Sequence, residues 1–164
     1  MGDSRIINST LVHLIKDGKY LMLHRVKKEG DYNKDKWIGV GGKFEPRESP
    51  EECARRETLE ETGLTIGKMD YRGIVTFVYQ DITEYMHLFT SEDFSGEMKE
   101  CDAGNLEWVD ISEVCNLPIW EGDKIFFKLM EDDAPFFSVK LVYDDDGNLI
   151  DHTENVYHGA GPRH

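Results

Sequence analysis

The chain is poor in cysteine and in basic residues, and it has no long apolar run. Its three cysteines, Cys53, Cys101 and Cys115, form no C-x-x-C pair, which argues against disulfides and zinc and favours a reducing cytoplasm. Only 19 Lys and Arg stand against 33 Asp and Glu, a formal charge of −14, whereas polynucleotide-binding proteins are usually basic. No stretch approaches the ~20 apolar residues of a membrane span, and no secretory signal is predicted.

Length and composition predict one globular domain. A chain of 164 residues with 39% hydrophobic and 11% aromatic content is long enough to bury a full core and is too apolar to be disordered. We expect this domain over residues 1–157, followed by a disordered tail at 158–164. Strands are predicted at 6–16, 20–25, 37–44, 71–80, 82–90, 106–110 and 136–143. A helical turn is predicted at 111–116, and a helix at 121–131 with Ile125, Phe126, Leu129 and Met130 buried. This is a mixed α/β (α+β) pattern.

The densest functional signal lies in residues 41–64, which read GGKFEPRESPEECARRETLEETGL. Ser49 is a good N-cap, Pro50 suits the first helical position, and Glu52 completes a capping box. Gly63 is placed to end the helix in a left-handed conformation. The pattern therefore predicts a helix from Pro50 to Thr62, directly after a glycine-rich loop.

Carboxylates crowd one side of this predicted helix. Glu57 and Glu61 are one turn apart and Glu60 is on the flank, and like charges at this spacing cost a few tenths of a kcal/mol each. A solvated acidic face with Arg55 and Arg56 as partners is the structural alternative. However, Leu59 is the only large apolar residue in the helix, so no ordinary buried stripe is present. We therefore predict a cation among the glutamates, and the neighbouring glycine loop indicates phosphate chemistry.

The spacing of this segment resembles the signature of the Nudix hydrolases. One position departs, because Thr58 stands where an aliphatic residue is usual, and we expect a small stability cost there. The resemblance implies an α/β/α sandwich with a mixed central sheet. The matching positions are Gly42, Glu48, Arg56, Glu57, Glu60, Glu61, Gly63 and Leu64.

The resemblance also implies roles for individual residues. Glu57 and Glu61 would be the main ligands of Mg²⁺, with Mn²⁺ as a substitute, while Glu60 lies close by and the Gly41 carbonyl completes the site. Magnesium prefers oxygen ligands and retains several waters. The other implied or candidate residues are Glu48 and Arg56 as a supporting salt bridge, Lys43, Arg25 and Lys28 for phosphate, and Glu100 or Asp102 as an additional acid.

Stretches outside the signature resemble the MutT/MutX-type members of this family, which hydrolyse oxidised purine nucleotides. By position, Trp120 would stack on the base and Asp123 would read its edge, with Ile38 also at the base. Two departures concern base selectivity: animal members have an asparagine at the place of Ile38 and a second aspartate at the place of Gly122. The structural alternatives are core packing for Trp120 and a helix first turn for Asp123. We interpret Trp37, His13, His24 and His87 as structural.

The reaction implied is hydrolysis of a nucleoside triphosphate, such as 8-oxo-dGTP, to the monophosphate and pyrophosphate. One alternative is a diphosphatase for ADP-ribose, nucleotide sugars or dinucleoside polyphosphates. Another is a non-catalytic nucleotide-sensing domain, although the intact glutamates argue against it. We expect a nucleoside triphosphate partner, no polynucleotide, no membrane, and a monomer or homodimer.

Overall fold

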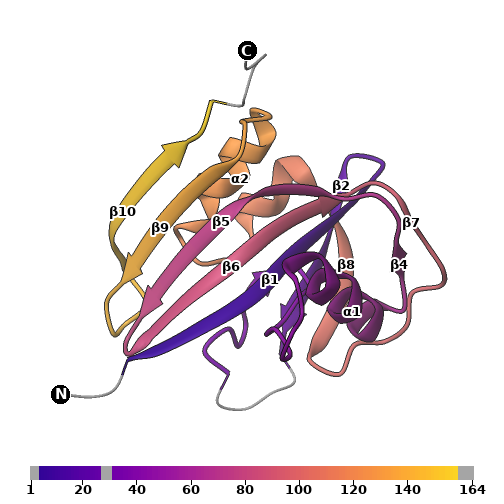
Figure 1. Ribbon diagram of the computed structural model, residues 1–164, viewed down its shortest axis with the longest axis horizontal. Helices are drawn as coiled ribbons and strands as arrows, with labels where there is room; N and C mark the ends of the chain where they lie inside the picture. The colour runs from indigo at the N-terminus through magenta and orange to yellow at the C-terminus, as the bar shows by residue number, and fades with distance from the viewer. Residues whose placement is uncertain (1–3, 27–30, 159–164) are drawn as a thin grey trace.

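The computed structural model describes residues 4–26 and 31–158, which fold around a large mixed sheet (Figure 1). The first half of the chain contributes β1 (Arg5–Lys16), β2 (Lys19–Arg25), β3 (Trp37–Ile38), α1 (Pro50–Thr62), β4 (Thr65–Ile66), β5 (Asp70–Tyr79) and β6 (Ile82–Ser91). The second half contributes β7 (Phe94–Ser95), β8 (Gly104–Asp110), the 3₁₀ helix η1 (Ile111–Asn116), α2 (Asp123–Glu131), β9 (Phe137–Tyr143) and β10 (Leu149–Val156).

Strand β1 joins two parts of the sheet. The strand order is β10-β9-β5-β6-β1-β2-β3, and β8 pairs with β2. Along most of its length β1 is parallel to β6, whereas its last two residues pair with the start of β2. The turn between β1 and β2 places Asp17 and Gly18 at φ of 53° and 74°, as a tight hairpin requires. A separate two-stranded sheet consists of β4 and β7.

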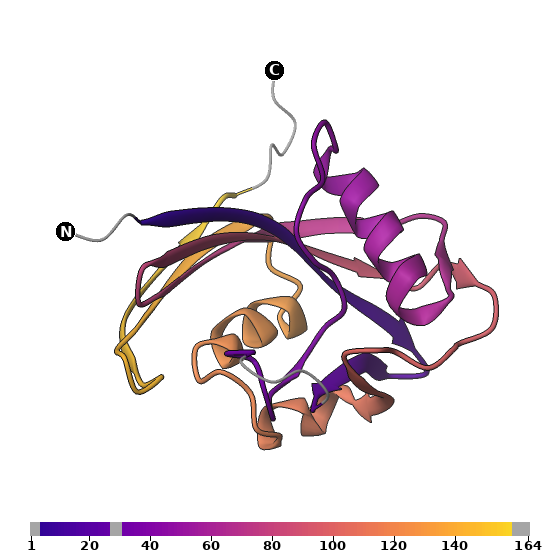
Figure 2. The ribbon, with the colours of Figure 1, turned by 90° about the horizontal axis from the view of Figure 1, so that it is seen from below.

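The two α-helices cover opposite faces of the sheet (Figure 2). Because successive side chains of a strand point to opposite faces, Leu11 belongs to the core cluster on the α2 side, and Val12 belongs to the cluster on the α1 side. The α1-side cluster includes Ala54, and the α2-side cluster includes Phe126. This arrangement confirms the predicted sandwich. None of the helices in the described ranges is long and apolar enough to cross a membrane.

The predicted elements differ from the observed ones mainly in the second half of the chain. Helix α1 has the predicted bounds, with both hydrogen bonds of the capping box and Gly63 in the left-handed conformation. Helix α2 begins at Asp123 rather than 121, because the Asp123 N–H bonds back to the Trp120 carbonyl in a turn. The prediction of its buried side was partly wrong: Phe127 is buried, whereas Ile125 and Leu129 are only half-buried.

The strand predicted at 37–44 is also shorter in the structure. Only Trp37–Ile38 forms β3, against β2. Beyond it the chain crosses to β1 and pairs there through the single bridges Val12–Val40 and Ser9–Lys43. The glycines between these bridges interrupt regular pairing, and this interruption forms the loop of the site. The short strands β4 and β7 and the edge strand β10 were not predicted as strands.

Candidate active site

The glycine loop is held against the edge of β1. The Thr10 N–H donates to the Gly42 carbonyl at 2.9 Å. Gly41 has φ of 139°, and a Cβ there would lie 2.1 Å from the Thr10 carbonyl oxygen. At Gly42 a Cβ would lie 2.6 Å from the Glu57 carboxyl carbon. Gly41 needs glycine, because of its positive φ and the β1 backbone against it, whereas Gly42 lies against the end of the Glu57 side chain.

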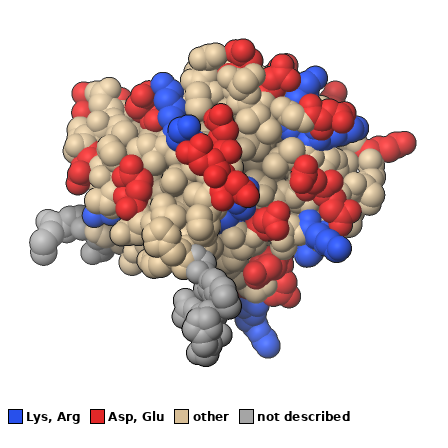
Figure 3. All heavy atoms as spheres, turned by 90° about the horizontal axis from the view of Figure 1, so that it is seen from above, with Lys and Arg blue, Asp and Glu red and all other residues tan. Residues whose placement is uncertain are grey.

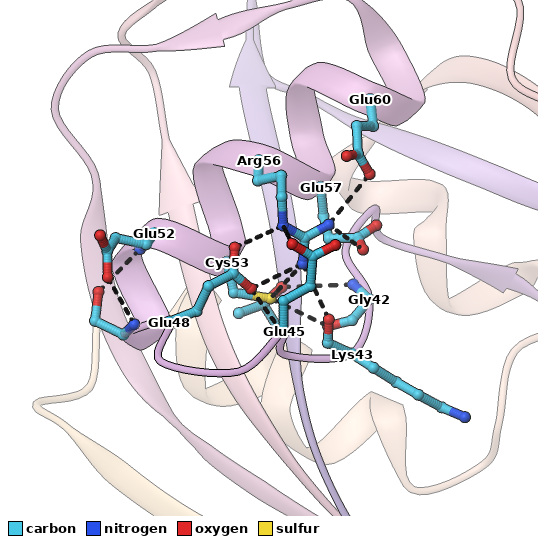
Figure 4. Close-up of polar contacts among 11 residues, drawn as sticks. Gly42, Lys43, Glu45, Glu48, Glu52, Cys53, Arg56, Glu57 and Glu60 are labelled. Carbon is cyan, nitrogen blue, oxygen red and sulfur yellow. Dashed lines mark hydrogen bonds and ion pairs between the residues drawn. The ribbon is translucent and has the colours of Figure 1, made fainter.

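Arg56 is the centre of the ionic contacts on α1 (Figure 4). Its Nε and Nη2 donate to the two oxygens of Glu48 at 2.6 and 2.8 Å, which is the bidentate geometry of a strong ion pair. Its Nη1 contacts Glu57 at 2.9 Å and Glu60 at 3.2 Å. The hydrogen bond from Arg56 lowers the pKa of the Glu48 carboxyl to about 2, and the same bond raises the pKa of Arg56. Arg56 therefore ties α1 to the loop before it.

The three glutamates of the motif have different surroundings. Glu61 accepts a 2.7 Å hydrogen bond from the Gly41 N–H, and Glu57 lies against Gly42. The Glu60 side chain is 57% exposed and turns toward Arg56. Within residues 4–26 and 31–158, no three His, Cys, Asp or Glu side chains gather closely enough to hold a metal ion unaided. Two carboxylates at the glycine loop, those of Glu57 and Glu61, nevertheless fit Mg²⁺, which takes one or two protein carboxylates and completes its shell with water and substrate oxygens.

A cavity of about 510 Å³ opens beside this loop, and the two glutamates Glu57 and Glu61 line one part of it. Lys43 also lines it, with its side chain extending away from Arg56 (Figure 4). Arg25 lines the cavity too, but its guanidinium is paired with Asp31 at 2.8 Å. Lys28 lies outside the described residues.

The two candidate loop acids, Glu100 and Asp102, are not among the residues that line this cavity. Glu100 lines a separate hollow of about 340 Å³. Asp102 lines neither of the two cavities, although its neighbour Ala103 reaches the larger one. The role of Glu100 or Asp102 as an additional acid therefore stays a prediction.

Trp120 lies in the wall of the same cavity and in the core. Its side chain is 5% exposed and packs edge-on to the rings of Phe77 and Tyr143, with centroids 5.0 and 4.8 Å away. The indole N–H donates to Asn33 at 2.7 Å, and the Lys36 ammonium lies 5.1 Å from the ring centroid. The packing shows that Trp120 belongs to the core, and its position in the cavity wall leaves stacking on a base as a prediction.

Asp123 is the first residue of α2, and it is buried in the cavity wall with 6% exposure. Burial raises the pKa of its carboxyl to about 8, and the nearby Lys36 opposes the shift. A carboxyl with this pKa keeps its proton at neutral pH, so that it can donate one hydrogen bond and accept another. Ile38 also lines the cavity and contributes only apolar surface to it.

Several cavity residues were missed from the sequence. Glu84 on β6 accepts hydrogen bonds from Ser9 and Tyr32, each at 2.6 Å. One signal was available, because Glu84 alternates with Ile82, Met86 and Leu88 in the strand and so falls on the apolar face. No comparable signal marks Asn33 or Tyr32, which lie in a charged loop. His13, which we interpreted as structural, is fully buried and has no hydrogen-bond partner among the described residues, and burial lowers its pKa to about 3.

The sequence and the fold of this chain are similar to those of known proteins. The NUDIX domain model matches residues 7–130. The chain is 37% identical over 123 residues to the oxidized purine nucleoside triphosphate hydrolase of Danio rerio, covering 74% of this chain and 77% of that protein. It is 32% identical over 113 residues to the uncharacterized Nudix hydrolase YvcI of Bacillus subtilis, covering 65% and 68%. The structure of the MutT protein from Bacillus halodurans superposes with a TM-score of 0.80 at 26% identity, covering 91% of this chain and 97% of that one.

Proposed function

This chain belongs to the Nudix family of hydrolases, and on that premise we propose that it hydrolyses nucleoside triphosphates to the monophosphate and pyrophosphate with Mg²⁺. The observation that carries the proposal is the cavity itself. One part of its wall holds Glu57 and Glu61 beside the glycine loop, and another part holds Trp120 and Asp123. Charged oxygen ligands and a base-sized aromatic wall in one cavity suit a nucleotide bound through a metal ion.

The proposed metal ligands are Glu57, Glu61 and the Gly41 carbonyl, with Glu60 beside them and Mn²⁺ as a substitute ion. When bound, the ion neutralises the diphosphate, orients it and activates a water. The protein's own contribution is to hold the ligands in place: Arg56 and Glu48 fix the loop to α1, and the Gly41 N–H orients the Glu61 carboxylate. Such supporting contacts commonly change metal affinity or activity by ~10–100-fold when removed.

The proposed phosphate contacts come from Lys43 and Arg25. Lys43 has its charge available beside the cavity, whereas Arg25 would be held in place by Asp31. The face drawn in Figure 3 is not suited to a polynucleotide. Acidic side chains are spread over the face in Figure 3, with Lys and Arg in smaller groups among them, in keeping with the formal charge of −14. A small polyphosphate can still bind if metal ions invert the local field.

We further propose that the preferred substrate is an oxidised purine nucleotide such as 8-oxo-dGTP. Trp120 offers an aromatic surface for the base, and Asp123 offers a group that both donates and accepts a hydrogen bond. The 37% identical relative bears a name that refers to oxidised purine nucleoside triphosphates, which supports the same substrate class here.

The test is a nucleotide panel with Mg²⁺, assayed for pyrophosphate and for orthophosphate. The panel contains 8-oxo-dGTP, dGTP, ADP-ribose, a nucleotide sugar and a dinucleoside polyphosphate. We expect pyrophosphate release, with the highest kcat/KM for 8-oxo-dGTP. A higher kcat/KM for one of the last three would favour a diphosphatase for that substrate. Nucleotide binding without any hydrolysis would instead indicate a sensing domain.

A further inference from the structure

Another carboxylate in the cavity wall, that of Glu84, is held by two neutral donors. Ser9 Oγ donates to Glu84 Oε2 at 2.6 Å, and the Tyr32 hydroxyl donates to Oε1 at 2.6 Å. Ser9 comes from β1, Tyr32 from the loop before β3, and Glu84 from β6. All three residues line the cavity. One hydrogen bond to each oxygen fixes the plane of the carboxylate.

The Glu84 carboxylate has acceptor capacity that these contacts do not use. Each carboxylate oxygen has about two acceptor sites, so one site on each oxygen remains after the bonds from Ser9 and Tyr32. Within the described ranges no Lys or Arg forms an ion pair with Glu84. A half-buried carboxylate without a cation is costly unless hydrogen bonds satisfy it. A ligand that brings two donors into the cavity would therefore satisfy this group.

The position of Glu84 favours the base rather than the phosphates as that ligand group. The Tyr32 ring stacks on Phe77 with centroids 5.9 Å apart and planes 16° apart, and Phe77 meets Trp120 edge-on. The carboxylate thus lies at the edge of an aromatic wall. It is also separated from the glycine loop by one strand, because β1 runs between β6 and the loop segment. Two strand spacings separate them by roughly 10 Å.

We propose that Glu84 reads the base by accepting hydrogen bonds from two adjacent N–H groups, so that the site selects guanine-type over adenine-type nucleotides. The Watson–Crick edge of guanine presents a ring N–H beside an exocyclic amine. Adenine instead presents a ring nitrogen acceptor beside its amine, which would face the carboxylate with a repulsive contact. Oxidation at C8 leaves the guanine edge intact. Ser9 and Tyr32 act as positioning residues.

This inference rests on the proposed function in that it narrows the substrate of the same site, and its test does not require turnover. Binding of dGMP, dAMP and GMP is measured by titration calorimetry with Mg²⁺. We expect wild type to bind dGMP more tightly than dAMP. Glu84→Gln replaces one acceptor by a donor. We expect it to weaken dGMP binding by about tenfold or more, whereas dAMP binding should change by less than about twofold. Glu92→Gln, the same change at an exposed position just after β6, is the matched control and should alter neither the dGMP affinity nor the dAMP affinity.

Tyr32→Phe is a second variant that keeps the ring on Phe77 and removes only the O–H donor. We expect it to weaken dGMP binding less than Glu84→Gln does and to leave dAMP binding unchanged. If Glu84→Gln does not fold, the result for Tyr32→Phe alone tests the inference. An unchanged ratio of the affinities for dGMP and dAMP overturns the inference. An equal loss of affinity for both nucleotides also overturns it, because it would indicate a structural role. If Glu84→Gln changed the affinity for GMP differently from the affinity for dGMP, Glu84 would contact the 2′-hydroxyl of the sugar. That result would also overturn the inference.

The binding experiment separates the two proposals. If no triphosphate is hydrolysed but Glu84→Gln still removes the guanine preference, the hydrolase proposal fails and the base-reading role stands. If 8-oxo-dGTP is hydrolysed and the preference is unaffected by Glu84→Gln, the hydrolase proposal stands and the role of Glu84 is wrong.

Discussion

The backbone N–H of Gly41 donates a 2.7 Å hydrogen bond to the carboxylate of Glu61, which joins the glycine loop to the last turn of α1. This hydrogen bond orients the carboxylate of Glu61, one proposed metal ligand. Its donor belongs to Gly41, the residue whose carbonyl is another proposed ligand. It forms only when the loop is docked on β1 and the helix is docked on the sheet. The ligand geometry therefore depends on three elements being assembled together.

The first prediction concerns the proposed ligands. Glu57→Gln and Glu61→Gln each remove a charged ligand at constant side-chain size, so we expect kcat to fall by roughly a hundredfold or more, since metal stabilisation is worth several kcal/mol. Glu60→Gln should cost less, because that side chain is largely exposed and outside the cavity wall. Steady-state kinetics with circular dichroism check this. Full activity in both Glu57→Gln and Glu61→Gln would rule out the proposed metal site.

The second prediction concerns stability in the presence of the metal. The glutamates of α1 repel one another, and the ion pairs of Arg56 with Glu57 and Glu60 neutralise part of that charge. Millimolar Mg²⁺ should therefore raise Tm, because it binds the folded state in preference to the unfolded chain. Glu57→Gln should reduce the rise. Calorimetry with Mg²⁺ and with a chelator checks it, and a Tm insensitive to Mg²⁺ would count against a preformed site.

The third prediction concerns Trp120. Trp120→Ala should raise KM for a purine triphosphate by about tenfold or more, since base–aromatic stacking is worth ~1–3 kcal/mol. It should also lower stability by ~3–5 kcal/mol, because the ring packs among Phe77 and Tyr143. Trp120→Phe keeps an aromatic face and should raise KM less. KM and Tm are measured for both variants. An unchanged KM in folded Trp120→Ala would leave this ring only a packing role.

The fourth prediction concerns pH and Asp123. The carboxyl has a pKa of about 8 in the folded protein, against 3.8 as its ordinary value. The folded state therefore keeps a proton that the unfolded chain releases, so this group makes stability fall as pH rises from about 4 to 8, by roughly 1.4 kcal/mol per pH unit at most. Asp123→Asn mimics the protonated form and should flatten that decline. Urea titrations at several pH values measure it, and parallel curves for the two proteins would contradict the assignment.

The same substitution also tests base recognition. An amide donates where an ionised carboxylate accepts, but it resembles a protonated carboxyl in offering both a donor group and an acceptor. With a pKa of about 8, Asp123→Asn should therefore change the kcat/KM ratio of 8-oxo-dGTP to dGTP more at pH 9 than at pH 6. A ratio unaffected at both pH values would show that the base is read elsewhere.

The fifth prediction concerns Thr58, the one departure from the Nudix signature. Its side chain is fully buried, and its hydroxyl has no hydrogen-bond partner in the part of the chain that the structure describes. Thr58→Val removes an unsatisfied polar group at similar volume and should stabilise the fold by about 1 kcal/mol, or ~2–4 °C in Tm. Thr62→Val is the matched control: that hydroxyl donates to the Thr58 carbonyl at 2.6 Å and accepts from Leu64 at 3.0 Å. We expect Thr62→Val to lower Tm, and a lower Tm in Thr58→Val would be contrary to prediction.

The sequence by itself determined helix α1 and the placing of Glu57 and Glu61 on one side of it. The signals for that helix are local, since the Ser49–Glu52 capping box spans three residues and the two glutamates are one helical turn apart. Hydrogen bonds and steric preferences at this range act in any tertiary context. The same reasoning failed at the start of α2, where a turn from Trp120 to Asp123 takes the place of the predicted first helical residues.

Only the tertiary structure decided what faces the cavity. Glu84 meets Ser9 across 75 residues and Tyr32 across 52, and Trp120 meets Asn33 across 87. Such contacts depend on the register between β1 and β6 and on the path of the loop before β3. A shift of one residue in strand register would turn Glu84 to the opposite face. The high pKa of Asp123 likewise follows from burial, and burial is a property of the assembled layers that no local pattern in the chain contains.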